Sequence, residues 1–144
     1  MEEYLFRSLN RLPSEKDSIN IIIPLLKDLR ETVGLREDQY FNLLVAVTEA
    51  VNNAIVHGNR MRGDKSVDLI ISANDTEVRI EVCDQGEGFN PEDIADCLHP
   101  DNILKDSGRG IFLIRSLVDQ VCFKPTKNGT KILMIIYYKN IQEV

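Results

Sequence analysis

The fold of this chain is decided by the stretch Thr48-Glu49-Ala50-Val51-Asn52-Asn53-Ala54-Ile55-Val56-His57-Gly58. It ends a longer run, from about residue 36 to residue 57, in which apolar residues recur at helical spacing, and this spacing predicts one long helix. Along that helix Glu49, Asn53 and His57 are separated by four residues each, so they form a polar line beside the apolar face. The line borders the predicted core.

A glutamate and an asparagine one helical turn apart suit a site that handles a proton and a cation. The Glu49 carboxylate can accept a proton from a water or a hydroxyl. The amide oxygen of Asn53 can hold Mg²⁺, which prefers oxygen ligands and keeps several of its waters. Taken alone, the pair is explained more simply by polar residues on a solvated helix face, so it predicts a site only together with other segments.

The first supporting segment is Asp84-Gln85-Gly86-Glu87-Gly88. Asp84 closes an alternating strand, so its carboxylate is expected at the strand end, where it can accept a hydrogen bond from an exocyclic amine such as that of adenine. Gly86 and Gly88 permit positive φ and a close approach of the backbone to a ligand. Thr130, on a neighbouring predicted strand, is expected to support Asp84. Alone, this segment is more simply an ordinary acidic turn.

The second supporting segment is Ser107-Gly108-Arg109-Gly110, which precedes an apolar helix predicted from Arg109 to Asp119. Free backbone N–H groups and the helix dipole at such a place can hold phosphate oxygens. The chain contains no Gly-x-x-x-x-Gly-Lys-[Ser/Thr], which excludes a P-loop enzyme. A Gly-x-Gly turn is weak by itself. The three segments follow one another in a fixed order: an acid and an amide on a helix, then an acid at the end of a strand, then a glycine turn before a second helix. This order predicts a nucleotide-binding protein.

The composition fits one soluble domain that spans residues 1–144. Hydrophobic residues make up 43% and charged residues 28% of the chain, which is ordinary for a globular protein. The net charge of −6 argues against direct binding of nucleic acid and suits protein partners. The N-terminus lacks the pattern of a signal peptide, and the densest apolar run, Ile21 to Leu26, is too short to span a bilayer, so we expect a cytoplasmic protein.

Three cysteines, Cys83, Cys97 and Cys122, are an odd number without a Cys-x-x-Cys pair. Neither a disulfide framework nor a zinc site is therefore predicted. We expect these cysteines to be small apolar residues of the core.

The remaining elements follow from periodicity and from turn residues. Gly58 is a plausible C-cap of the long helix. The other elements are a strand from Tyr4 to Leu9, a helix from about Ser14 to Gly34 with Pro24 inside it, strands Val67 to Ala73 and Glu77 to Asp84 around the turn Asn74-Asp75-Thr76, a short helix opened by Pro91, a mobile loop from Leu98 to Ser107, and strands Val121 to Lys124 and Thr130 to Tyr138. Helices and strands segregate in this order, which predicts an α+β two-layer sandwich with a mixed, mostly antiparallel sheet and helices on one face.

Together the segments resemble the three boxes of the Bergerat-fold ATPases, the superfamily of gyrase, the heat-shock chaperones, histidine kinases and MutL. Glu49 to Asn53, Asp84 to Gly88 and Gly108 to Gly110 match those boxes. From about Phe6 to Tyr138, the chain is further similar to the bacterial anti-sigma factor serine/threonine kinases of the partner-switching type. The Thr48 to Gly58 stretch, the short chain and the final Gly129-Thr130 strand carry this narrower resemblance.

The resemblance implies a role for each candidate residue in binding ATP and Mg²⁺. Glu49 would be the general base, Asn53 the Mg²⁺ ligand and Asp84 the residue that reads adenine, with Thr130 near the base. The phosphate side and the hinge of a lid would be formed by Gly86, Gly88, Gly108, Arg109 and Gly110.

The resemblance also implies an activity and partners. Proteins of this type bind a sigma factor in one state and, in the other, phosphorylate a serine or threonine of a small anti-anti-sigma (STAS) protein. They also form homodimers, for which the apolar run Ile21 to Leu26 offers a surface that core burial explains equally well. The family carries an arginine in the first helix that contacts both partners, and the aligned position here is Asn20.

Two other functions compete with the kinase. A nucleotide-binding regulatory partner-switch module without kinase activity is favoured by Asn20 but opposed by the presence of both Glu49 and Asn53. The catalytic domain of a sensor histidine kinase would require a phospho-accepting histidine on a dimerising helical hairpin. The chain holds only His57 and His99, and neither has such a setting.

Overall fold

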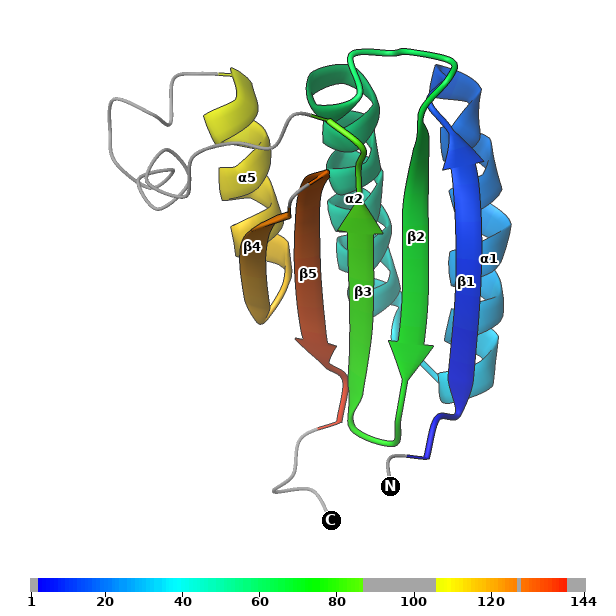
Figure 1. Cartoon of the computed structure of the whole chain (residues 1–144). Helices are drawn as coiled ribbons and strands as arrows, with labels where there is room; N and C mark the ends of the chain where they lie inside the picture. The colour runs from blue at the N-terminus through cyan, green and yellow to red at the C-terminus, as the bar shows by residue number, and fades with distance from the viewer. Residues whose placement is uncertain (1–2, 87–105, 127, 140–144) are drawn as a thin grey trace.

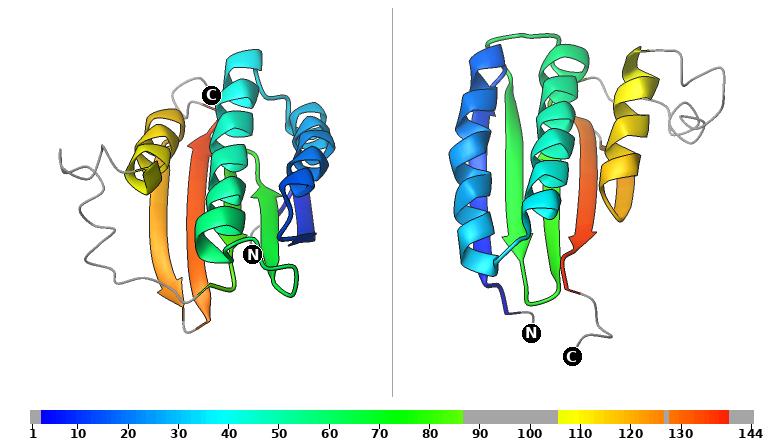
Figure 2. Two further views of the ribbon diagram at one scale, coloured as in Figure 1. Left: turned by 90° about the horizontal axis from the view of Figure 1, so that it is seen from above. Right: turned by 180° about the vertical axis from the view of Figure 1, so that it is seen from behind.

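The computed structural model of this chain describes residues 3–86, 106–126 and 128–139. In this part of the chain a five-stranded sheet is covered on one face by three helices (Figures 1 and 2). The elements are β1 (Phe6–Pro13), η1 (Lys16–Ser18), α1 (Ile19–Val33), α2 (Glu37–Asn53), η2 (Ala54–Gly58), β2 (Ser66–Ala73), β3 (Glu77–Cys83), α5 (Asp106–Leu117), β4 (Gln120–Thr126) and β5 (Gly129–Tyr137).

The strands lie in the order β1-β2-β3-β5-β4, and every pair among the described strands is antiparallel. The predicted hairpin joins β2 to β3. Its turn is stabilised by the side-chain oxygen Oδ1 of Asn74, which accepts hydrogen bonds from the backbone N–H groups of Thr76 and Glu77, both at 2.9 Å. Such a turn fixes the register of the two strands. The predicted α+β two-layer architecture is confirmed.

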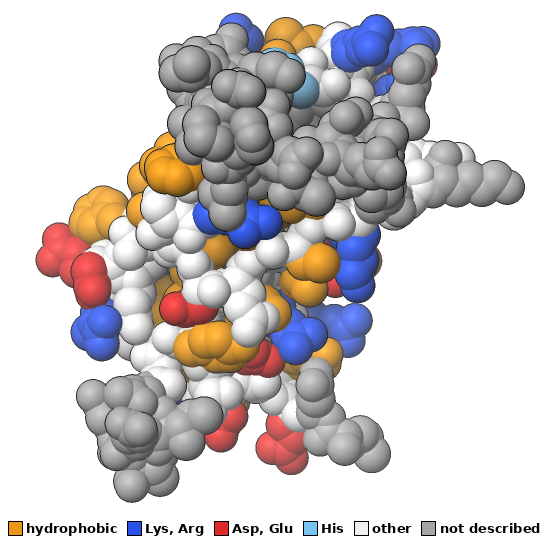
Figure 3. All heavy atoms as spheres, turned by 90° about the vertical axis from the view of Figure 1, so that its left-hand side faces the viewer, with side chains coloured by type: hydrophobic (Ala, Val, Ile, Leu, Met, Phe, Trp, Pro, Cys, Tyr) orange, Lys and Arg blue, Asp and Glu red, His pale blue; other side chains and the backbone are white. Residues whose placement is uncertain are grey.

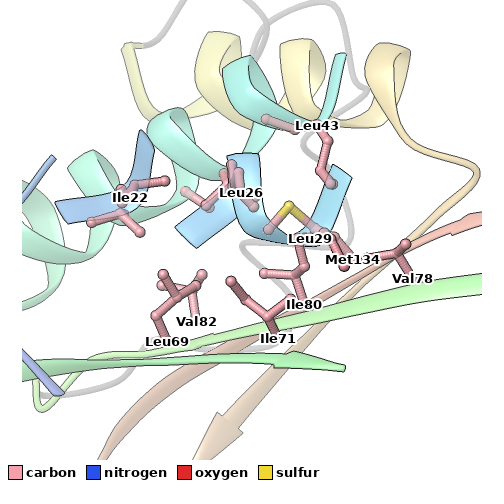
Figure 4. Close-up of a cluster of buried hydrophobic side chains, with 14 of the residues drawn as sticks. Ile22, Leu26, Leu29, Leu43, Leu69, Ile71, Val78, Ile80, Val82 and Met134 are labelled. Atoms are coloured by element: carbon pink, nitrogen blue, oxygen red, sulfur yellow. The ribbon is translucent and has the colours of Figure 1, made fainter. Parts of the chain in front are cut away.

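The core lies between the helices and one face of the sheet (Figure 4). Each strand of the sheet centre buries alternate residues, whereas α1 and α2 each bury one stripe at helical spacing. The side chains that meet there include Ile22, Leu26, Leu29, Leu43, Leu69, Ile71, Val78, Ile80, Val82 and Met134. This packing fixes the position of α2 over β3 and β5, and therefore the place of the polar line on α2.

The first strand and the first helix differ from their predicted bounds. The strand predicted from Tyr4 to Leu9 runs from Phe6 to Pro13, because it pairs along the whole of β2. The helix predicted from about Ser14 begins only at Ile19, after the turn η1; as predicted, it contains Pro24 and ends at Gly34, whose φ of +77° is the left-handed conformation of a C-cap glycine.

The long predicted helix is interrupted before its expected end. The α-helical part stops at Asn53, and residues Ala54–Gly58 form a π-helical turn that is closed by a hydrogen bond from the Asn59 N–H to the Ala54 carbonyl at 2.8 Å. Gly58 is therefore not the C-cap that the sequence predicted. π-Helical turns are rare in proteins, and those that occur often lie at functional sites.

The cysteine prediction is wrong for two of the three residues. Cys83 is half-buried, since β3 points Val82 into the core and therefore points Cys83 to the opposite face, and Cys122 of β4 is exposed. Cys97 lies outside the described residues, as do His99, the helix predicted at Pro91 and the predicted loop as far as residue 105. None of the described helices is long and apolar enough to cross a membrane.

Replacing a fully buried leucine tests this packing. We expect Leu26→Ala to lower the free energy of unfolding by about 2–5 kcal/mol, because Leu26 is 0% exposed and its loss leaves a cavity between α1 and the sheet. Leu9→Ala is the control, since Leu9 is 76% exposed, and its effect should stay within about 0.5 kcal/mol. Urea unfolding measures both. Equal losses in the two variants would contradict the arrangement of the layers.

Candidate functional site

The predicted motifs come together at one end of the molecule. The C-terminal end of α2, the end of β3, the beginning of β5 and the N-terminal end of α5 all lie at the upper end in Figure 1. The sheet topology explains why these segments meet: β3 and α2 end at the same end of the sheet at which the antiparallel strand β5 begins.

Asp84 follows β3 directly and is held by the backbone of two other segments. Its carboxylate oxygen Oδ1 accepts hydrogen bonds from the backbone N–H of Gly86 at 2.9 Å and of Thr130 at 3.0 Å. Its own N–H donates to the Thr130 carbonyl at 3.0 Å. Among the described residues no group donates to the second oxygen, Oδ2. One oxygen is thus used to fix the side chain, and the other is left as an acceptor.

Two opposing influences act on the charge of this carboxylate. Burial raises the pKa of Asp84, because desolvation opposes the charged form, while the hydrogen bonds from Gly86 and Thr130 and the positive charge of Lys65 lower it. Burial is the largest of these effects. A partner that donates a hydrogen bond to Oδ2 would therefore relieve a desolvated acceptor.

Three glycines surround Asp84 so closely that a side chain would not fit. A Cβ at Gly58 would strike the Asp84 carboxylate, one at Gly86 would strike the Gly58 carbonyl, and one at Gly129 would strike the Asp84 carbonyl. The Gly86 backbone does come close to the Gly58 carbonyl, but its φ is not positive, and its predicted approach to a ligand stays a prediction. We call Gly58, Gly86 and Gly129 the cradle of Asp84. Gly58 was missed as a site residue because it contacts a residue 26 positions later in the chain.

Glu49 and Asn53 lie on the side of α2 that faces α5. Both are half-buried, and Gly110 of α5 is buried against them. A Cβ at Gly110 would lie 2.5 Å from Oε1 of Glu49 and 2.9 Å from Nδ2 of Asn53. The absence of a side chain at Gly110 therefore lets the backbone of α5 reach the acid and the amide, which the sequence had placed one helical turn apart.

The glycine turn itself is not where it was predicted. The helix α5 begins at Asp106, so Gly108, Arg109 and Gly110 lie inside its first turns and not in a loop before it. Glycine weakens a helix by only about 1 kcal/mol relative to alanine, so the helix can include both glycines. Because only the first N–H groups of a helix are free of internal bonds, the donors available to an anion lie near residue 106.

Other predicted residues are placed only in part. Gly88 lies outside the described residues, and His57 is exposed in the π-helical turn. No group of three or more His, Cys, Asp or Glu side chains within described residues is arranged to hold a metal ion. The amide oxygen of Asn53 next to the Glu49 carboxylate suits Mg²⁺ in another way, as a single protein contact to an ion that keeps waters and phosphate oxygens.

Comparison with known protein sequences gives consistent results. Residues 12–136 match the protein family described as "Histidine kinase-like ATPase domain". The serine-protein kinase RsbW of Staphylococcus epidermidis is 32% identical over 139 residues, which cover 92% of this chain and 87% of that protein. The serine-protein kinase RsbW of Staphylococcus aureus (strain bovine RF122 / ET3-1) is 27% identical over the same length, with the same coverage.

Two solved structures show the same fold. The RsbU and RsbW domains of a Mycobacterium tuberculosis protein match with a TM-score of 0.68 at 16% identity, over 92% of this chain and 32% of that one. The blue-light activated histidine kinase of Erythrobacter litoralis EL346 matches with a TM-score of 0.61 at 19% identity, over 92% of this chain and 44% of that one.

A methyl group at Gly58 tests the cradle around Asp84. We expect Gly58→Ala to lower the free energy of unfolding by about 1–3 kcal/mol, because the carboxylate is held by Gly86 and Thr130 and cannot swing away without losing those bonds. Gly63→Ala is the matched control, since no atom lies within 4 Å of a Cβ at that position. Chemical denaturation of both variants gives the comparison. A harmless Gly58→Ala would rule out the close contact.

Proposed function

The chain belongs to the histidine kinase-like ATPase domain family and, within it, to the RsbW serine-protein kinases; from this membership we propose that it is an anti-sigma factor that phosphorylates a serine or threonine of an anti-anti-sigma (STAS) protein. The observation that carries the proposal is a pair of close approaches to the continuous helical segment formed by α2 and η2: Gly110 lies against Glu49 and Asn53 of α2, and Asp84 lies against Gly58 of η2. The residues proposed for the two ends of a nucleotide thus meet along one helical segment.

Asp84 is the residue proposed to recognise adenine. Its Oδ1 is engaged by two backbone N–H groups, so Oδ2 is the oxygen that can accept a hydrogen bond from the exocyclic amine. A hydrogen bond to a charged acceptor contributes about 1.5–3 kcal/mol, which is enough to favour adenine over a base without that amine. Thr130 acts through its backbone, since its N–H helps to fix Asp84.

The phosphate side is assigned to α5 and to Asn53. The first N–H groups of α5 would donate to a phosphate group of the nucleotide at the helix start, where the helix dipole favours negative charge. The amide oxygen of Asn53 would hold Mg²⁺, which when bound supplies positive charge to the phosphate oxygens. Gly108 and Gly110, which carry no side chains, and Arg109 between them are proposed to contribute to this phosphate side. Gly88 is proposed to complete the phosphate side from outside the described residues.

Glu49 is the proposed general base. The hydroxyl oxygen of the partner's serine or threonine attacks the γ-phosphorus of ATP, and its proton passes to the Glu49 carboxylate. The bond between the γ-phosphorus and the bridging oxygen of the β-phosphate breaks, and ADP and the phosphorylated partner leave. Because this reaction needs mainly positioning and charge neutralisation, one base, one metal ligand and backbone donors suffice.

The partners are proposed to meet the helix layer. Asn20 is exposed near the start of α1, at the place where the family carries an arginine. Ile21 and Ile23 are 42% and 46% exposed, whereas Ile22 and Leu26 are fully buried, so only part of the apolar run predicted as a partner or dimer surface serves the core.

Direct binding to nucleic acid has no support on the face that carries α5 and β4, because basic side chains there are interspersed with acidic and hydrophobic ones (Figure 3). Nucleic-acid binding would need a concentrated basic surface.

A sigma factor and a STAS protein as partners would make this a cytoplasmic regulator.

Removing the general base separates a kinase from a binding module. We expect Glu49→Gln to slow transfer of labelled phosphate from ATP to the cognate STAS protein by about 100-fold to 10,000-fold, because the amide cannot accept the proton. Binding of ADP should change little. Glu37→Gln is the control, since Glu37 is an exposed glutamate at the other end of the same helix. If the wild type transfers no phosphate, the chain acts as a partner-switch module without kinase activity.

Removing the amide of Asn53 tests the metal contact. Calorimetric titration of wild-type protein with ADP should show tighter binding in Mg²⁺ than in EDTA. In Asn53→Ala we expect this difference to shrink by about tenfold, the size of a change of about 1.4 kcal/mol in binding free energy. Asn52→Ala, the neighbouring half-buried asparagine, should keep the wild-type difference. Magnesium-independent binding by the wild type would remove the proposed role of Asn53.

A further inference from the structure

Asn59 is a buried amide beside the cradle of Asp84. It follows the π-helical turn directly, its N–H closes that turn, and the whole residue is 0% exposed. A carboxamide brings two donor hydrogens and an acceptor oxygen into the interior, and these need partners if the fold is to be stable.

The carboxamide of Asn59 joins three separate segments. Its Nδ2 donates to Oγ of Ser14 at 2.8 Å and to the backbone carbonyl of Ser66 at 2.9 Å. Its Oδ1 accepts the backbone N–H of Gln85 at 2.7 Å. The residue therefore links the segment before α1, the beginning of β2 and the peptide that follows Asp84.

The orientation of this amide is fixed by its backbone partners. A backbone carbonyl can only accept and a backbone N–H can only donate, so Nδ2 must face Ser66 and Oδ1 must face Gln85. A further hydrogen bond runs from the Ser66 N–H to the side-chain oxygen Oε1 of Gln85 at 2.8 Å. Asn59, Ser66 and Gln85 thus form a closed ring of hydrogen bonds.

The ring holds the Asp84 segment from the side opposite β5. On the β5 side, Thr130 exchanges two hydrogen bonds with Asp84. On the other side, Asn59 takes the N–H of Gln85, the residue between Asp84 and Gly86. Since a hydrogen bond weakens steeply as distance and angle depart from their optimum, the position of Oδ2 depends on both anchors.

We propose that Asn59 is a positioning residue for base recognition: it holds the peptide from Asp84 to Gly86 so that Oδ2 of Asp84 stays in reach of the exocyclic amine of adenine. This role rests on the proposed function, because it assumes that Asp84 reads the base. Asn59 itself touches neither nucleotide nor partner in this role. It acts through the peptide of Gln85.

The test compares two nucleotides that differ in that amine alone. ADP and purine riboside 5′-diphosphate, which lacks the exocyclic amine, are titrated into the full-length protein. The wild type should bind ADP about tenfold to a hundredfold more tightly, the preference expected for a hydrogen bond to a charged acceptor. In Asn59→Ala this preference should fall to about threefold or less, while binding of the purine nucleotide changes little.

Ser14→Ala is the matched control. It removes a partner of the same carboxamide but leaves the bonds to Ser66 and Gln85 in place, so the preference for ADP should match the wild type. Asn59→Ser, which removes less buried volume, serves if Asn59→Ala does not fold. Equal weakening of both nucleotides in the Asn59 variants, with the wild-type preference intact, would overturn the role of Asn59 alone.

A measurement without variants tests the anchor itself. In the nucleotide-free wild type, the Gln85 amide should exchange its hydrogen much more slowly than an amide without a hydrogen-bond acceptor, because the buried side chain of Asn59 accepts it. Fast exchange at Gln85 would overturn the inference whatever the nucleotide data show. A wild type that does not distinguish the two nucleotides would instead overturn adenine recognition by Asp84, and this role of Asn59 with it.

Discussion

A half-buried carboxylate, that of Asp84, is the constraint on which the functional end of the molecule depends. Burial opposes its charge, and backbone N–H groups of Gly86 and Thr130 offset part of that cost. Gly58 and Gly129 lie so close to Asp84 that a Cβ at either position would collide with its carboxylate or its carbonyl. The carboxylate thus fixes how the ends of β3, β5 and α2 meet, and it keeps one oxygen available to a ligand.

The two-layer packing sets the geometry on the other side of α2. The apolar stripe of this helix is buried on the sheet, so the polar line beside the stripe turns toward α5. Gly110 then allows the α5 backbone to lie on Glu49 and Asn53. The π-helical turn follows these residues and ends with Gly58, the residue that lies against the Asp84 carboxylate. The core packing, rather than any local preference of the polar residues, brings the acid and the amide to α5.

Local periodicity was enough to predict the layers, the long helix and the hairpin at Asn74, because each depends on residues close together in the chain. The strand-end position of Asp84 followed from the same alternation. The π-helical turn did not, since helical spacing continues through it and only its contacts with other elements, among them β2 and β5, distinguish it. Gly58 and Asn59 were missed for this reason, since the contact of Gly58 with Asp84 and that of Asn59 with Gln85 each join residues 26 positions apart. Cys83 was assigned to the core because composition does not say which face of a strand a residue occupies.

The start of α5 shows why the phosphate side was harder to predict than the base side. Asp84 is held by neighbours in a sheet whose register leaves no freedom, so its place follows once the strands are known. The glycines of α5 can lie in a loop or in a helix at a difference of about 1 kcal/mol per glycine, which the sequence alone does not decide. The contact of Gly110 with Glu49 nevertheless joins the two sides, since α2 carries the acid and η2, which continues it, carries Gly58 against Asp84, the proposed adenine acceptor. The proposed base site and the proposed phosphate site are therefore coupled through the helical segment from Glu49 to Gly58.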